Sequence, residues 1–162
     1  MTNDPCEMFM RRAVAAAQVR GSDKYPDIHG EVRFYPQADS VLVRAEITGL
    51  PQNDSPCENP IFAFHIHGGQ ACTGTAADPL ADAGMHLNPN DCPHPYHAGD
   101  MPPLFGVNGR ALLIFATNRF RIPQIIGKTV IIHARPNDFV TQPSGNAGEK
   151  IACGVIEWAA LQ

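Results

Sequence analysis

The stretch IHGEVRFYPQADSVLVRAEITGL, residues 28–50, contains two runs in which a small or apolar residue recurs at every second position. This alternation is typical of strands with one face in a core and the other in solvent. Pro, Gly and Asp-Ser residues, which favour turns, close each run. The stretch therefore predicts two half-buried β-strands. The alternating residues are Ile28, Gly30, Val32 and Phe34 in the first run and Val41, Val43, Ala45 and Ile47 in the second.

Five further segments share the character of these runs, because they are rich in β-branched or aromatic residues and are bounded by turn formers. Seven or eight strands separated by turns favour a β-sandwich or a Greek-key barrel. One segment, RAVAAAQV at residues 12–19, also fits the start of a helix when it is taken alone. The five segments span residues 12–21, 60–68, 110–120, 127–135 and 149–159.

The length and charge of the chain narrow the function classes. With 162 residues we expect one domain over residues 1–162, of which residues 1–11 form a flexible N-terminal tail. Charged residues make up 17% of the chain and the net charge is −4, so no nucleic-acid surface is indicated. No apolar run approaches the roughly 20 residues that span a bilayer, and the N-terminus does not resemble a secretory signal. We therefore expect a small-molecule partner, no membrane contact, and a cytoplasmic location unless the chain is a processed exported form.

The region from Gly68 to Gly109 interrupts the strand pattern. It holds seven glycines and six prolines but no convincing strand. Its most polar part, HLNPNDCPHPYHAGD at residues 86–100, has almost nothing apolar to offer a core. A structureless loop of this length is uncommon in a compact domain unless a function or a bound ligand orders it.

Histidines on the neighbouring strands suggest what that ligand is. In FAFHIHG, residues 62–68, His65 and His67 project from one face of the predicted strand while Phe64 and Ile66 project from the other. Two imidazoles on one face fit a metal site, but they equally fit two surface histidines on a half-buried strand. His133 ends the apolar run KTVIIH, where a histidine without any binding role is also common.

Within residues 86–100, three histidines and an aspartate have the spacing of a zinc site. Pro93 and Pro95 argue against a helix there, so we expect a loop wrapped around the ion. Three imidazoles and one carboxylate complete a tetrahedral set for Zn²⁺, and metal binding would order a loop that has no apolar core. A polar, solvated loop is the alternative. The four residues are His86, His94, His97 and Asp100.

Five short segments, in this order along the chain, resemble the successive signature segments of the copper/zinc superoxide dismutases. The similarity extends from about Arg12 to Ala159, and several motifs in order are far more specific than any one alone. It implies an all-β fold: an eight-stranded Greek-key β-barrel or sandwich with long metal-binding and active-site loops. The segments are FHIHGG, AGMHLNP, HAGDMP, IIGKTVIIH and GNAGEKIACGVI.

The resemblance also implies a reaction and its ligands. Superoxide would be disproportionated to dioxygen and hydrogen peroxide by cycling between Cu(II) and Cu(I), with His86 bridging the metals and carrying the catalytic proton. His29 has no counterpart role and is expected to be an ordinary surface residue. The implied copper ligands are His65, His67, His86 and His133, and the implied zinc ligands are His86, His94, His97 and Asp100.

Two positions depart from the family pattern. Lys150 takes the place of an arginine that guides the anion, and it would guide superoxide more weakly because it lacks the planar fork; an ordinary surface lysine is the alternative. Asn137 takes the place of an aspartate that links a copper-binding and a zinc-binding histidine. Its carbonyl can still accept a hydrogen bond from each ring, but it lacks the negative charge that raises ligand basicity, so we expect either that Asp138 takes over with a shifted loop or that zinc affinity is weaker.

The five cysteines allow up to two disulfides. The resemblance implies a bond between Cys72 and Cys153, which would close a long loop and contribute roughly 4 to 5 kcal/mol. A second bond between Cys57 and Cys92 is a hypothesis, and Cys92 as a zinc ligand is a weaker one because the set is already complete. Cys6 is expected to be a free thiol in the tail.

Two functions from different classes follow from these features. The first is an enzyme, a copper/zinc superoxide dismutase. The second is a protein of the same fold that sequesters or delivers copper and zinc without turnover, which the departures at Lys150 and Asn137 keep open. The intact set of implied copper ligands favours the enzyme. The sequence allows either a monomer or a homodimer, and it indicates a packing or interface role for Trp158.

Overall fold

A computed structural model describes residues 12–55, 57 and 60–160 of the chain. The predicted tail and Cys6 lie outside these residues. No helix in the described part of the chain is long and apolar enough to cross a membrane. The strands are β1 (Ala15–Gly21), β2 (His29–Pro36), β3 (Val41–Thr48), β4 (Ile61–Phe62), β5 (Phe64–His67), β6 (Leu104–Phe105), β7 (Arg110–Thr117), β8 (Thr129–His133) and β9 (Lys150–Trp158).

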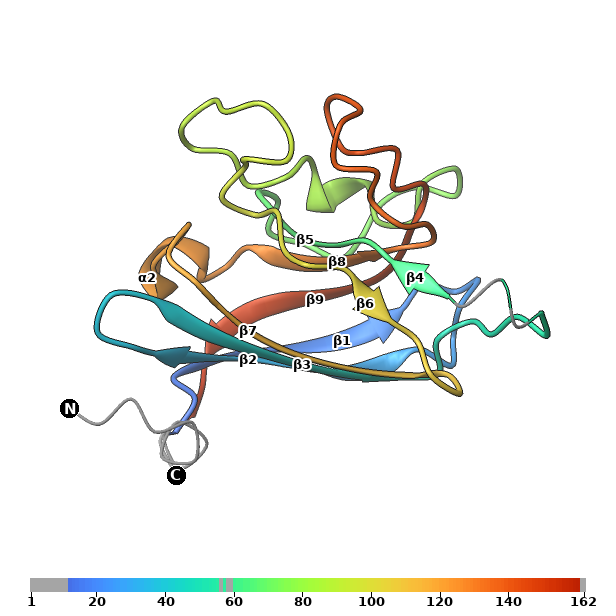
Figure 1. The fold of residues 1–162 in the computed structure, drawn as a ribbon, viewed down its shortest axis with the longest axis horizontal. Coiled ribbons are helices and arrows are strands. Elements are labelled where there is room, and N and C mark those ends of the chain that lie inside the picture. The colour runs from blue at the N-terminus through green and yellow to red at the C-terminus, as the bar shows by residue number, and fades with distance from the viewer. Residues whose placement is uncertain (1–11, 56, 58–59, 161–162) are drawn as a thin grey trace.

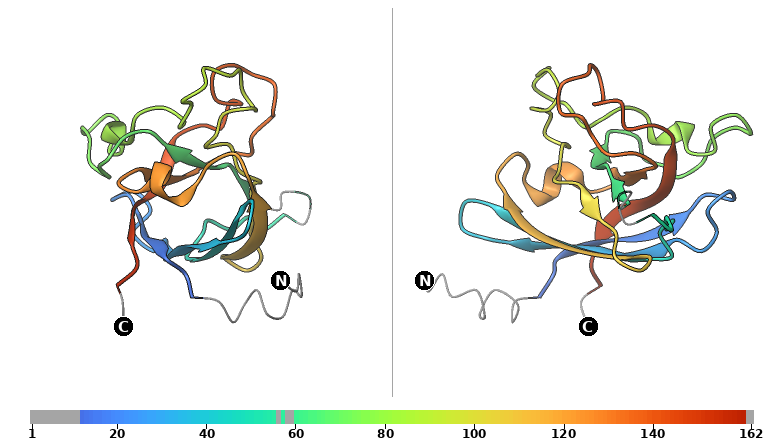
Figure 2. Two further views of the ribbon diagram at one scale, coloured as in Figure 1. Left: turned by 90° about the vertical axis from the view of Figure 1, so that its left-hand side faces the viewer. Right: turned by 45° about the vertical axis from the view of Figure 1, so that its right-hand side comes forward.

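Seven of these strands form one curled antiparallel sheet (Figures 1 and 2). Its order is β5-β8-β9-β1-β2-β3-β7, so the chain leaves β3 and crosses over before it returns as β7 beside β3. The opening stretch forms β2 and β3, which pair along their whole length with Phe34 opposite Val43 and Val32 opposite Ala45. The all-β fold predicted from the alternation is thus confirmed.

A second, very short pairing links the two edges of the curled sheet. β4 is separated from edge strand β5 by Ala63 alone, and β6 precedes edge strand β7. The pairs Ile61 with Phe105 and Phe62 with Leu104 join β4 to β6. Counting β4 and β5 as one strand gives the eight strands of the implied barrel.

The core lies inside the curl and consists of the side chains that alternation directed inward. Phe34, Ile47, Phe64 and Ile151 are fully buried there and belong to one apolar cluster. Burying each such side chain stabilises the fold by about 1.5–3 kcal/mol. Phe64 and Ile66 face this core, so the intervening His65 and His67 face the other way, toward the loops.

The predicted strand at residues 12–21 is confirmed as β1, and the helix start that its alanines also fitted is absent: β1 pairs between β2 and β9, and Ala15 and Ala17 enter the core. Two other local features were not expected. Strand β6 and a 3-10 turn at Ala81–Ala83 occur in the region 68–109, where no strand was expected. A one-turn helix, α2 (Ile122–Ile125), connects β7 to β8 and was not predicted, since four residues are too few to show helical periodicity.

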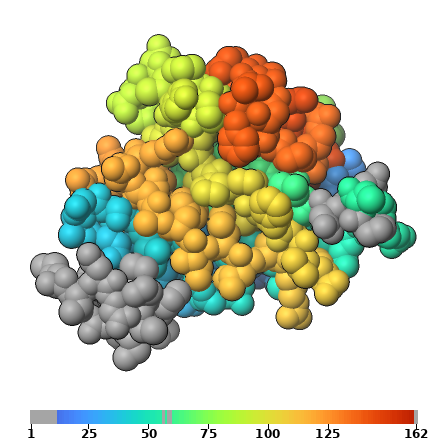
Figure 3. Space-filling view, viewed as in Figure 1, coloured from blue at the N-terminus to red at the C-terminus, as the bar shows by residue number. Residues whose placement is uncertain are grey.

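Two long loops gather on one side of the curled sheet, above β5 and β8 (Figure 1). We call residues 68–103 the first loop and residues 134–149 the second loop. The space-filling view shows residues 86–100 of the first loop directly against the second loop (Figure 3). Backbone hydrogen bonds hold both loops to the sheet, from Ile66 N to Gly99 O at 2.8 Å and from Ala63 N to Arg135 O at 2.9 Å.

Candidate metal centre

Strand β5 supplies two histidines to the space under the loops. Every residue of β5 is buried, and His65 and His67 are 0% and 3% exposed. Across the ladder, His65 pairs with Ile131 and His67 with Thr129 of β8, whose last residue is His133. Three histidines therefore reach one side of the sheet through strand register alone.

The first loop adds its ligands by running along the free edge of β5. Backbone bridges pair His67 with His86 and His65 with Asp100. Between them, Leu87 N donates to Ile66 O and Gly99 N donates to Leu87 O. This strand-like path brings both ends of the stretch 86–100 over β5, although the stretch itself contains no strand. These backbone hydrogen bonds place the first loop where its histidines meet those of the sheet.

The first cluster consists of four buried histidines whose ligand atoms lie within 4.8 Å of one another. His67 Nδ1 donates to Gly84 O at 2.7 Å and His133 Nδ1 donates to Gly148 O at 3.1 Å. Because a carbonyl only accepts, each ring carries its proton on Nδ1, and neither Nε2 atom has one. The two Nε2 atoms lie 3.2 Å apart, so their lone pairs face each other. Such a contact is repulsive unless a cation lies between the rings. The four residues are His65, His67, His86 and His133.

Two more nitrogens in this cluster are buried without a hydrogen-bond partner. They are His65 Nδ1 and His86 Nε2. A buried polar atom without a partner costs free energy, so each needs a ligand that the described protein atoms do not supply. Four imidazole nitrogens that converge in this way match the ligand preference of copper.

The second cluster surrounds the carboxylate of Asp100. Its Oδ1 lies 2.8 Å from His86 Nδ1, and its Oδ2 lies 3.0 Å from His94 Nδ1 and 3.4 Å from His97 Nδ1. All four residues are buried, and their ligand atoms lie within 4.8 Å of one another. Three imidazole nitrogens and a carboxylate oxygen are a complete zinc set, so the residues present fit that ion. His86 belongs to both clusters, with Nδ1 facing this one and Nε2 facing the first.

Burial and mutual repulsion disfavour the charged form of four of these rings. Desolvation, reinforced by the neighbouring imidazoles, lowers the pKa of His65, His67 and His97, and it lowers the pKa of His133 to about 4. Burial alone would raise the pKa of Asp100, but the hydrogen bond from His86 and the nearby rings outweigh it, so the net shift is downward. Neutral imidazoles and an ionised carboxylate are the forms that bind metals.

Asn137, on the second loop, links the two clusters. Its Oδ1 accepts from His94 Nε2 at 2.8 Å and from Phe139 N at 2.7 Å, and its Nδ2 lies 3.1 Å from His65 Nε2. The Phe139 N–H fixes which end of the amide is oxygen, since it can only donate. The carbonyl therefore does not accept from both rings, as the sequence suggested; the amide nitrogen donates to His65 instead.

Asp138 does not take over this link. It is exposed, and its carboxylate accepts from Thr141 and from Val140 N, which lowers its pKa. The loop therefore needs no shift, because Asn137 already reaches both rings. Gly145 makes this possible: it has a φ of +70°, and a Cβ there would lie 2.0 Å from Asn137 Oδ1.

Two residues that the sequence did not single out hold the first loop around the second cluster. Arg119, just after β7, donates to the carbonyls of Pro95, His97 and Asp100 at 2.7, 3.3 and 3.4 Å. Gln142 of the second loop exchanges two hydrogen bonds with the backbone of His94, at 2.9 and 2.8 Å. Neither belongs to a motif, so no local sequence signal distinguishes them.

Lys150 lies beside the first cluster but is not a free cation. It is the first residue of β9 and pairs across the ladder with His133. Its side chain is only 16% exposed, and Nζ lies 2.6 Å from Asp78 Oδ2. His29, in contrast, belongs to neither cluster: it is exposed and contacts Asp27 O and Thr48 Oγ1.

One disulfide is present among the described residues, between Cys72 and Cys153, as the resemblance implied. Cys57 and Cys92 are free, so the second disulfide is wrong. Cys57 belongs to the connection from β3 to β4, and Cys92 belongs to the first loop. Cys92 belongs to neither described metal cluster; its carbonyl accepts from Asn88 Nδ2 instead.

Comparisons with known proteins agree with this geometry. Residues 28–156 match the family model described as copper/zinc superoxide dismutase. A Cu-Zn superoxide dismutase of Deinococcus radiodurans is 30% identical over 153 residues, which cover 83% of this chain and 80% of the relative. One from Legionella pneumophila is 29% identical over 165 residues, covering 93% of each chain, and one from Xenopus laevis is 30% identical over 146 residues, covering 80% of this chain and 89% of the relative.

Proposed function

The chain belongs to the copper/zinc superoxide dismutase family, and we propose that its first cluster binds copper, its second cluster binds zinc, and the pair disproportionates superoxide. The observation that supports this assignment most strongly is the set of nitrogens in the first cluster. Two of these nitrogens are buried without a hydrogen-bond partner, and the other two lie 3.2 Å apart with their lone pairs toward each other. A bound cation relieves both conditions at once, with His65 Nδ1 giving up the proton that the Asn137 amide favours on it.

The protein groups have separate tasks in this reaction. When bound, copper would supply the one-electron oxidation and reduction of superoxide, and zinc would supply a fixed positive charge. The bonds to Gly84 O and Gly148 O orient His67 and His133 with Nε2 inward. His86 can hold a proton on Nε2 while Nδ1 stays on the zinc side, so it is placed to pass that proton to the reduced product.

Access to the first cluster is through a hollow of about 370 Å³ between the two loops. His67, His86 and His133 line its inner end, and Lys150 lies beside them. A small anion fits this space, and the ammonium of Lys150 is the group we propose to contact it. The fully buried β5 and the covering loops keep bulk water from the rest of the cluster.

The experiment that tests the proposal is superoxide disproportionation by pulse radiolysis, on protein reconstituted with one copper and one zinc. We expect fast catalysis by the wild type and the loss of catalysis in His133→Ala, which removes one proposed ligand. His29→Ala is the matched control, because it deletes the exposed histidine outside both clusters. A copper-loaded wild type without turnover would contradict the enzyme and support metal storage or delivery.

A homodimer stays a prediction of the same proposal. Trp158, at the end of β9, is 56% exposed and lines a surface hollow with Arg33 and Glu157. A large aromatic side chain in such a place is typical of interfaces. We expect sedimentation velocity to show a dimer that Trp158→Ser weakens. A monomer at every concentration would contradict it.

A further inference from the structure

The hollow that leads to the first cluster is electrically balanced at its mouth. Lys150 lies 2.6 Å from Asp78, and Glu149, the neighbouring acid, lies 2.8 Å from Lys24. Asp78, Glu149 and Lys150 all line the hollow, and no other lysine or arginine among the described residues lines it. An approaching anion therefore meets a cation whose charge is already matched by a carboxylate.

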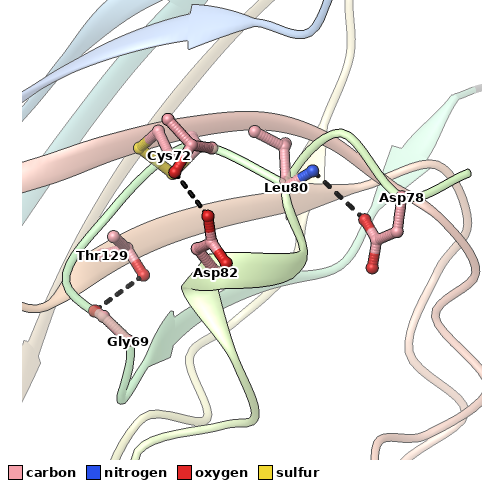
Figure 4. Close-up of a disulfide and its surroundings, with 8 residues drawn as sticks. Gly69, Cys72, Asp78, Leu80, Asp82 and Thr129 are labelled. Atoms are coloured by element: carbon pink, nitrogen blue, oxygen red, sulfur yellow. Dashed lines mark hydrogen bonds between the residues drawn. A yellow bond between two sulfur atoms is a disulfide. The ribbon is translucent and has the colours of Figure 1, made fainter. Parts of the chain in front are cut away.

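Hydrogen bonds from neighbouring residues of the same segment hold Asp78 in place. Its Oδ1 accepts from Leu80 N at 3.2 Å, and its backbone carbonyl accepts from Thr75 N and Ala81 N (Figure 4). Leu80 is buried against Ile131 and Cys153 of the sheet. The carboxylate is thus fixed at the rim, and the ion pair with Lys150 lowers its pKa, so it is charged at neutral pH.

The disulfide ties the two partners together. Cys72 belongs to the segment that carries Asp78, and Cys153 lies three residues beyond Lys150 on β9. Figure 4 shows the bond at Cys72 near Leu80 and Asp82, with Asp78 beyond Leu80 on the same segment. The Lys150 side chain is 84% buried, given its 16% exposure, so it has little freedom to swing away from the carboxylate.

We propose that Asp78 is a positioning residue that sets the place and the effective charge of Lys150, and so limits how strongly the hollow attracts anions. This inference rests on the proposed function, because it concerns anions that reach the first cluster. An incoming anion has to compete with the Asp78 carboxylate for the same ammonium. Removing that carboxylate leaves the ammonium free, while removing the ammonium leaves an uncompensated negative charge.

The proposal predicts a ranking of four proteins by the charge of the pair. Asp78→Asn has one net positive charge, the wild type and the double variant Asp78→Asn/Lys150→Gln have none, and Lys150→Gln has one negative charge. Because one charge in a narrow mouth changes anion attraction several-fold, we expect Asp78→Asn to bind azide about fivefold more tightly than the wild type. The double variant should lie near the wild type, and Lys150→Gln should bind azide most weakly.

The measurement is a titration of the copper-loaded and zinc-loaded proteins with azide, followed by the Cu(II) absorption, at several ionic strengths. Relative to the wild type, added salt should weaken anion binding in Asp78→Asn and strengthen it in Lys150→Gln. Superoxide disproportionation, measured on the same samples, should follow the same order. Asp78→Glu keeps the carboxylate and should therefore bind azide as tightly as the wild type. A purely structural role for the aspartate would not require this result.

Asp82→Asn is the matched control. Asp82 lies on the same segment, is exposed, and accepts from Thr73 Oγ1 rather than from Lys150 (Figure 4). Equal azide affinities for Asp78→Asn, Asp82→Asn and the wild type would overturn the proposal, as would weaker binding by Asp78→Asn. If Asp78→Asn does not retain its metals, the salt dependence of Lys150→Gln decides: azide binding that strengthens with added salt, relative to the wild type, shows the uncompensated Asp78 carboxylate and supports the proposal, and an unchanged salt dependence overturns it.

The two proposals fail separately in this design. A wild type that binds copper and azide but does not consume superoxide contradicts the proposed dismutase activity. In that case the order of azide affinities among the variants still tests the role of Asp78. A wild type that consumes superoxide with no difference in azide affinity among the variants contradicts only the role of Asp78.

Discussion

The sheet wall, formed by β1, β2, β3 and β7, and the two loops over β5 are held by different forces. The wall has full ladders and an apolar inner face, so alternation along each strand determines it. The loops have few apolar contacts, and a disulfide, Arg119, Gln142 and Asn137 cross-link them instead. Substitutions in the wall should therefore change the stability of the whole fold, whereas substitutions in the loops should change metal affinity.

The largest effect should be the acid sensitivity of the metal-free protein. His133 has a folded pKa of about 4 against about 6.5 in the unfolded chain, so the unfolded state binds more protons between these values. Its contribution to stability is complete above about pH 6.5 and is lost as the pH falls, by about 3 kcal/mol at pH 4. His65, His67 and His97, whose pKa values are also lowered, add losses of the same sign.

Urea unfolding of metal-free protein between pH 8 and pH 4 checks this expectation. His133→Gln should flatten part of the dependence, whereas His29→Gln, outside the clusters, should leave it unchanged. If stability stayed constant over this range, the buried histidines would not be the acid-sensitive part of the fold.

Phe34→Ala should destabilise the wall by about 3–5 kcal/mol, because Phe34 is fully buried and its removal leaves a cavity beside Phe120. Leu112→Ala, on the outer face of β7 and 63% exposed, is the control and should change stability by less than about 0.5 kcal/mol. Urea unfolding measures both. The zinc dissociation constant of folded Phe34→Ala should stay within about twofold of the wild type; a larger change would erase the distinction between wall and loops.

Asn137→Asp should raise copper affinity about tenfold. At present the amide donates to His65 Nε2, which favours a proton on Nδ1, the atom that faces the first cluster. A carboxylate accepts from both rings, so the proton moves to Nε2 and Nδ1 becomes free for the metal. Asn146→Asp, on the same loop but bonded to Arg135, is the control. Competition titration with a copper chelator measures the change, and equal affinities for the two variants would rule out the tautomer argument.

Arg119→Ala should have the smallest effect, a loss of zinc affinity of about threefold with copper affinity unchanged. The guanidinium is at the surface, so its three carbonyl contacts contribute modestly. Zinc competition titration measures the loss, and Arg110→Ala, at the other end of β7, is the control. A loss of both metals would show that Arg119 supports the whole loop assembly and not the zinc side alone.

Sequence pattern alone predicted the strands because alternation is a local property. Phe34 and Val43 face inward for the same reason that any half-buried strand alternates, and the histidines of β5 follow from the same rule. Ordered motifs indicated the family. They also drew attention to Lys150 and Asn137 as departures, because a motif defines which residue is usual at a position.

The partners of those residues were beyond sequence reasoning. Asp78 meets Lys150 across 72 positions, and Arg119 meets Pro95 across 24, with no periodicity to predict either contact. The orientation of the Asn137 amide depends on Phe139 N, a single backbone group in a loop. Such contacts are set by tertiary packing of loops, and for that reason the expectations about Asp138 and about the pair Cys57 and Cys92 were wrong.

The closure of the sheet has a consequence for the metal-depleted protein. Among the described residues, two pairs join β4 to β6, and beyond them the edge of β5 is covered by residues 85–100, which Arg119 links to the end of β7. The first loop is therefore a structural part of this weakly paired seam of the barrel. If that loop detaches, the backbone groups of an edge strand become available to another molecule, and exposed edges promote strand-to-strand aggregation. Zinc would then protect this protein from self-association as well as orient its histidines.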